Sequence, residues 1–113
     1  MKILAFAGSN SKNSINKQLL NYTLGQLENA EIDLVDINDF EMLIYSIDRQ
    51  LESGFPQLAE DFYKKIKDAD GLVISLAEHN GNFSVALKNI LDWVSRIEMP
   101  YLKDKKILLL STS

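Results

Sequence analysis

The sequence predicts an α/β fold in which helices cover both faces of an open parallel sheet. Short apolar runs without alternation are typical of strands buried on both faces, and two occur, at residues 3–7 and 71–77. Segments with apolar residues at helical spacing separate the expected strands, which gives the order βαβαβαβ. Such strands are joined by right-handed crossovers into one parallel sheet. The 113 residues fit one domain.

The individual elements follow from periodicity and from their boundary residues. The expected strands are residues 3–7, 32–37, 71–77 and 105–110. The expected helices are residues 15–27, 56–66 and 84–97. Ser14 is placed to cap the first helix, Pro56 suits the first turn of the second, and Pro100 ends the third. Residues 38–55 have no clear period, so we expect a long loop there, and such loops are often functional.

The composition excludes several classes of protein. With 46% hydrophobic and 25% charged residues the chain is typical of a globular protein, and its net charge of −4 argues against nucleic-acid binding. The absence of cysteine excludes disulfides, thiolate metal sites and cysteine nucleophiles. The apolar run at the N-terminus is too short for a signal peptide, and no run approaches the length of a membrane span. We expect a cytoplasmic protein that binds neither nucleic acid nor membrane.

The loop after the first expected strand, residues 8–16, is a candidate anion site. Ligands of open α/β sheets bind beyond the carboxyl ends of the strands, and this loop is rich in hydroxyl and amide side chains there. It leads into a helix, whose N-terminus offers free N–H groups and a positive dipole end to a phosphate. Serine and asparagine are as common in a capped loop without a ligand, so the composition alone leaves both interpretations open.

The loop after the third strand is also polar but contains no recognisable catalytic group. Gly81 permits a tight turn, Glu78 has no identifiable partner, and a lone His79 is more often solvated than catalytic. Trp93 on the next helix is typical of packing or of an interface. The glycine-rich nucleotide motifs, the paired acids of a receiver domain, a histidine pair and a nucleophile elbow are all missing from the sequence. We therefore predict no catalytic side chain and no metal site.

These two loops resemble the signatures of the NADPH-dependent FMN reductase family. The first signature reads roughly G-S-x-R-x-x-S-x-N-x-x-L, and residues 8–16 read GSNSKNSIN, with Leu19 following. The second signature is longer and more specific. It begins at residues 69–70, and its end is closely matched by residues 87–93, which read LKNILDW. The resemblance covers the whole chain.

The resemblance implies a flavodoxin-like sheet, with strand order 2-1-3-4, that binds FMN across the strand ends. FMN would supply the chemistry, taking hydride from NADPH or NADH and passing electrons to a quinone, a free flavin or a similar small acceptor. The FMN phosphate would bind to Ser9, Ser11, Ser14 and Asn16. The isoalloxazine ring would lie against Glu78, His79, Asn80 and Gly81. The resemblance also implies a homo-oligomer, either a dimer or a tetramer.

Two differences from the signatures bear on flavin affinity and redox tuning rather than on the fold. Ser11 stands where the family has arginine, so a bidentate contact to the phosphate is lost, although Lys12 could substitute as a point charge. Ala77 and His79 stand where the family has proline and tyrosine. A large ring beside the flavin is thereby replaced by a smaller, titratable one.

We predict that His79 borders the flavin ring and makes the flavin potential depend on pH between about 5 and 8, where a histidine changes charge. A redox titration of the wild-type protein and of His79→Phe across this range measures the effect. Identical pH slopes in the two proteins would remove His79 from the mechanism.

The family continues past its fourth strand with a further cofactor loop, a fifth strand and two helices. We therefore expect residues 1–113 to form a single, incomplete FMN-binding domain. Residues 106–111 would be an apolar edge strand without an internal gatekeeper charge, which favours pairing with another strand. Apolar side chains of the third and fourth strands would also face water, at a cost of roughly 1.5–3 kcal/mol each. The helix at residues 87–93 resembles a family dimer element and offers association that avoids this edge.

We predict that the chain is not a self-sufficient monomeric flavin enzyme, because it needs a second chain, a missing segment or a reorganised end. Light scattering during an FMN titration checks this. A soluble monomer that binds FMN tightly and turns over NADPH at ordinary enzyme rates would contradict it.

Two alternatives to an enzyme stay open. An electron carrier would bind flavin without consuming NADPH, and an inactive fragment of the family fold would not bind FMN.

Overall fold

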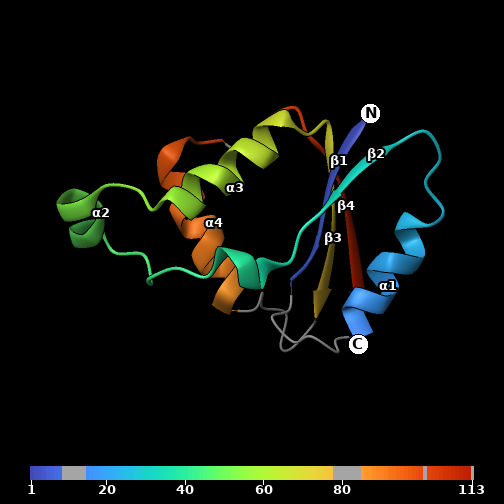
Figure 1. Cartoon of the computed structure of the whole chain (residues 1–113), viewed down its shortest axis with the longest axis horizontal. Coiled ribbons are helices and arrows are strands. Elements are labelled where there is room, and N and C mark those ends of the chain that lie inside the picture. The colour runs from blue at the N-terminus through green and yellow to red at the C-terminus, as the bar shows by residue number, and fades with distance from the viewer. Residues whose placement is uncertain (9–14, 78–84, 101, 113) are drawn as a thin grey trace.

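A computed structural model describes residues 1–8, 15–77, 85–100 and 102–112. Four parallel strands form one sheet with helices on both faces, and the strands point toward the lower side of Figure 1. The elements in chain order are β1 (Lys2–Ala7), α1 (Ile15–Leu24), β2 (Glu31–Leu34), the 3-10 helix η1 (Ile37–Phe40), α2 (Ile47–Ser53), α3 (Gln57–Asp68), β3 (Gly71–Ala77), α4 (Val85–Ile97) and β4 (Lys106–Thr112). The strand order β2-β1-β3-β4 confirms the predicted flavodoxin-like topology.

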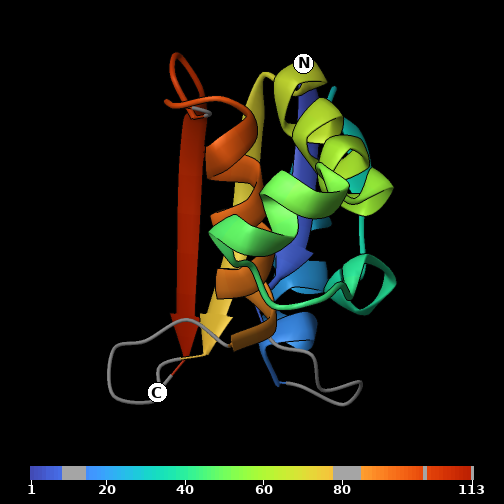
Figure 2. The same cartoon turned by 90° about the vertical axis from the view of Figure 1, so that its left-hand side faces the viewer.

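Two apolar cores lie on opposite faces of the sheet because successive residues of β1 point to opposite sides. Ile3 and Ala5 pack toward α1, whereas Leu4 and Phe6 pack toward α3 and α4. On the latter side the ring of Phe62 meets Phe6 edge-on, with centroids 5.4 Å apart. Figure 2 shows α3 and α4 in front of the sheet and α1 behind it. This two-sided burial explains why the first strand is a continuous apolar run.

The start of the central strand pair is fixed by Asp70, directly before β3. Its backbone N–H donates to the Lys2 carbonyl at 2.8 Å, and its carboxylate accepts the Lys2 N–H at 2.7 Å. From there β1 and β3 pair in register from Ile3 opposite Gly71 to Ala7 opposite Ser75. The Asp70 that opens the second family signature therefore sets the register of the sheet.

Several element boundaries differ from the prediction. The first helix ends at Leu24 instead of residue 27, directly before Gly25. The second strand ends at Leu34, because the Asp36 carboxylate accepts the Asn38 N–H at 2.9 Å and starts η1. Pro56 is the N-cap of α3 and not a residue of its first turn. Each difference lies at the end of a helix or strand, where local capping contacts determine the terminal residue.

The prediction of an unstructured loop over residues 38–55 is wrong, since this segment contains the end of η1 and all of α2. The Ser46 hydroxyl accepts the Arg49 N–H at 3.1 Å and caps α2, and Gly54 ends it with a φ of 73°. No residue of α2 is buried. The helix therefore has no apolar stripe that faces the core, and the periodicity of the sequence could not reveal that a helix forms here.

β4 lies at the edge of the described sheet, as predicted for residues 106–111. Ile107, Leu108 and Leu109 are 42%, 45% and 59% exposed. The expectation that apolar residues of the third strand also face water is wrong for Leu72 and Val73, which are buried. Helices already cover both, since Leu72 belongs to the core against α3 and α4, and Val73 to the core against α1.

Candidate functional site

The winding of the chain reverses between β1 and β3, at their carboxyl ends. β1 leads toward α1 on one face of the sheet, and β3 leads toward α4 on the other face (Figure 1). The two strands are neighbours, and the Gly8 N–H donates to the Ser75 carbonyl at 2.6 Å. In open α/β sheets the crevice at such a switch point is where ligands bind.

Gly8 allows the two strand ends to approach this closely. A Cβ at Gly8 would lie 2.9 Å from Leu76 Cδ2 and 3.1 Å from Leu87 Cδ2. Leu87 belongs to α4 and is buried. Gly8 thus packs the start of the first loop against both β3 and the helix that follows the second loop. Only a residue without a side chain fits this position without displacing its neighbours.

The structure describes the elements that flank the residues predicted to hold a flavin, but not the side chains of those residues. The following predicted residues lie outside the described part of the chain: Ser9, Ser11, Ser14, Glu78, His79, Asn80 and Gly81. Asn16 belongs to α1, but its side chain is not among those described. Residues 9–14 connect Gly8 to the first residue of α1, and residues 78–84 connect Ala77 to the first residue of α4. Their roles stay predictions.

Lys17 was not selected from the sequence, yet the structure places it beside the carboxyl ends of β1 and β2. It lines an open hollow of about 250 Å³ together with Ala7, Asp36 and residues of α1. Its Nζ lies 4.0 Å from Asp36 Oδ2. A lysine in the first turn of a helix interacts unfavourably with the helix dipole. Its presence there in the sequence is the feature that could have indicated an acidic partner or a bound anion.

A larger hollow of about 740 Å³ opens between β2 and α3, away from the switch point. Both charge signs line it, including Lys2, Lys64, Glu31 and Asp61. Across it Lys65 Nζ lies 2.9 Å from Asp33 Oδ2. This mixed, partly paired lining near the beginning of β1 offers no set of groups that selects one ligand.

The described elements at the switch point are compatible with a bound flavin mononucleotide. The sheet opens there between helices of opposite faces, and α1 begins at the end of the first loop with its N-terminus toward the strand ends. Gly8 adds no side chain of its own at this point, where Leu76 and Leu87 approach closely. Among the described residues, no three histidine or acidic side chains are grouped to hold a metal ion. No helix in the described ranges has the length and apolar character needed to cross a membrane.

We predict that Gly8→Ala lowers the free energy of unfolding by about 1–3 kcal/mol, since its Cβ overpacks Leu76 and Leu87. FMN affinity should fall as well, because both loops start from the displaced strand ends. Thermal melts and FMN titrations measure the two effects.

Gly25→Ala is the matched control for this variant. A Cβ at Gly25 meets only the carbonyl oxygens of Tyr22 and Asn21, at 3.4 and 3.6 Å. It should change stability by less than about 0.5 kcal/mol. If Gly8→Ala behaves like this control, the close approach at the switch point is unimportant.

The whole chain resembles known proteins. The family model of NADPH-dependent FMN reductases matches residues 1–113. The chain is 41% identical over 98 residues to a 2-hydroxy-1,4-benzoquinone reductase of Burkholderia sp, covering 85% of this chain and 51% of that protein. It is 31% identical over 114 residues to a quinone reductase of Escherichia coli (strain K12), covering 100% of this chain and 60% of that protein.

A solved structure shares the fold. FerB from Paracoccus denitrificans, described as a flavoenzyme NAD(P)H:(acceptor) oxidoreductase, superimposes with a TM-score of 0.80 at 24% identity. The match covers 99% of this chain and 60% of FerB. The chain therefore spans between one half and three fifths of the length of these relatives.

Proposed function

The chain belongs to the NADPH-dependent FMN reductase family, and from this premise we propose that it binds FMN at the β1–β3 switch point and uses NADPH or NADH to reduce a quinone or a similar small acceptor. The observation that carries this proposal is the hydrogen bond from the Gly8 N–H to the Ser75 carbonyl, which joins the start of the first loop to the strand that leads into the second loop. The relatives that are named quinone reductases support quinones as the acceptor class.

The loop residues bind and orient the flavin in this proposal. Hydroxyls of Ser9, Ser11 and Ser14, the Asn16 amide and the N–H groups at the start of α1 would donate to the phosphate. The second loop would line the isoalloxazine ring with Glu78, His79, Asn80 and Gly81. When bound, FMN supplies hydride and electron transfer between the nicotinamide and the acceptor. The loop side chains need only hold the ring and exclude water, which agrees with the absence of a catalytic motif.

We also propose that the protein works in the cytoplasm as a homo-oligomer, a dimer or a tetramer. The lack of cysteine in the sequence is compatible with a reducing compartment. The exposed apolar residues of the β4 edge support self-association.

The site assignment predicts that Ser14→Ala weakens FMN binding by roughly tenfold or more, because a hydrogen bond to a charged phosphate is lost. Riboflavin, which lacks the phosphate, should bind equally to the variant and to the wild type. Fluorescence titrations with both ligands measure this, and NADPH consumption with a quinone separates an enzyme from an electron carrier.

Ser46→Ala is the matched control for the loss of a helix cap. Ser46 caps α2 through the Arg49 N–H, so its removal costs about 1 kcal/mol of stability. FMN affinity should be unchanged in this variant. Equal losses for FMN and riboflavin in Ser14→Ala would refute the phosphate assignment, and flavin binding without NADPH consumption would favour the carrier.

A further inference from the structure

Lys17, the third residue of α1, carries a positive charge directly after the first candidate loop, residues 8–16. Its side chain is 24% exposed and lines the open hollow between α1 and the carboxyl ends of β1 and β2. Side chains of a helix tilt toward the helix N-terminus, so the ammonium of a first-turn lysine can reach the end of the helix. A negative charge bound there would offset the unfavourable interaction of this lysine with the helix dipole.

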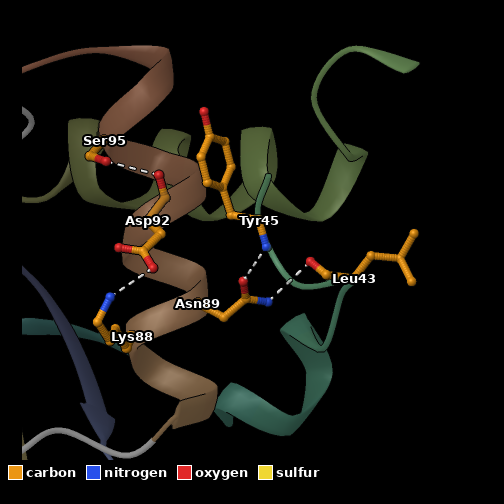
Figure 3. Close-up of polar contacts among 6 residues, drawn as sticks. All are labelled: Leu43, Tyr45, Lys88, Asn89, Asp92 and Ser95. Atoms are coloured by element: carbon orange, nitrogen blue, oxygen red, sulfur yellow. Dashed lines mark hydrogen bonds and ion pairs between the residues drawn. The ribbon is translucent and has the colours of Figure 1, made fainter. Parts of the chain in front are cut away.

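The pair between Lys17 and its acidic partner is a loose one. Lys17 Nζ lies 4.0 Å from Asp36 Oδ2, which is beyond the length of a hydrogen bond. On α4, by contrast, Lys88 Nζ donates to Asp92 Oδ2 at 3.0 Å, as Figure 3 shows. Asp36 therefore leaves the three donors of the Lys17 ammonium unused.

Asp36 is fixed by another contact, whereas Lys17 is free to move. Asp36 Oδ1 accepts the Asn38 N–H at 2.9 Å and caps η1. The Lys17 ammonium lies at the end of a flexible four-carbon stem. A rearrangement of this pair is thus a movement of the lysine and leaves the carboxylate in place.

We propose that Lys17 turns from Asp36 to the phosphate of bound FMN and supplies a positive charge to that site. This inference rests on the proposed FMN site at the switch point and assigns to it a residue that the family signature leaves unspecified. Ser11 stands where the signature has arginine, so the first loop lacks the cation with which the family would meet a phosphate. Lys17 offers a replacement from the helix, and Lys12 of the loop is the rival cation.

A phosphate monoester competes well with Asp36 for the Lys17 ammonium. Such a phosphate carries a charge of about −1.5 to −2 near pH 7, whereas the carboxylate carries a single negative charge. A partly exposed ion pair without a hydrogen bond contributes little to stability, so its loss costs little. A hydrogen bond between an ammonium and a phosphate is charge-assisted at both ends and is stronger.

Fluorescence titrations of wild type and Lys17→Gln with FMN and with riboflavin test the proposal. The variant should raise the dissociation constant of FMN by roughly tenfold, and Lys17→Arg should restore most of this loss. Riboflavin lacks the phosphate, so its dissociation constant should be the same in both proteins. Added salt should weaken FMN binding less in Lys17→Gln than in wild type, because one charge interaction fewer is screened. A lysine that serves only the fold would leave this salt dependence unchanged.

Asp36→Asn tests the competition from the other side. Asparagine keeps an oxygen for the cap of η1 but removes the charge that holds Lys17 away from the phosphate. FMN should bind about two- to fivefold more tightly to this variant, and the gain should shrink when Lys17→Gln is added. Lys65→Gln is the matched control, because Lys65 pairs with Asp33 at 2.9 Å away from the switch point and its loss should leave FMN binding unchanged.

Equal FMN affinity and equal salt dependence in Lys17→Gln and wild type, with thermal melts that show both folded, would overturn the proposal. A loss of FMN affinity in Lys12→Gln but not in Lys17→Gln would also overturn it and assign the charge to the loop. Either result would leave the flavin site standing. A wild-type protein that binds no FMN would instead contradict the proposed function and this inference together.

Discussion

The pairing of β1 with β3 at the centre of the sheet determines which side chains enter each core and where the two candidate ligand loops begin. Asp70 joins the beginnings of the two strands through both its backbone and its carboxylate. The register that follows places Gly8 against Ser75 at the other end. A slip by one residue would turn the alternating side chains of β1 toward the wrong cores. It would also separate the starting points of the two candidate ligand loops.

α4 connects the candidate flavin site to residues 43–45, the segment before α2. Its inward face fills the core with Leu87, Ile90 and Val94, all buried. Leu87 also contacts the start of the first loop, since a Cβ on Gly8 would collide with it. Asn89 and Trp93, four residues apart, form hydrogen bonds with the backbone of Leu43 and Tyr45. One helix thus ties the end of the second loop to the segment that leads into α2.

Much of the fold could be predicted from the sequence because its strands are buried on both faces. The run at residues 71–77 has the predicted bounds, and the strand order follows from the family resemblance. Apolar residues at helical spacing likewise predicted a helix over residues 84–97, and Leu87, Ile90 and Val94 form the buried face of α4. Leu91 and Ile97 on the same helix are only partly buried.

What could not be predicted depends on local caps and on long-range contacts. α2 faces no core, and only its caps, Ser46 and Gly54, could have indicated it. The hydrogen bonds of Asn89 with Tyr45 and of Trp93 with Leu43 join residues more than 40 positions apart, and no sequence periodicity reveals such pairs. The family signature includes both residues, but a match does not say what they contact. The loop residues assigned to FMN likewise stay a prediction from the signatures.

The central claim is that both loops at the β1–β3 switch point hold one FMN. The most direct measurement is a crystal structure of the protein grown with FMN. Density for the phosphate is expected at residues 9–16, beside the start of α1, and density for the ring against residues 78–84. FMN bound in the hollow between β2 and α3, or no FMN at saturating concentration, would contradict it.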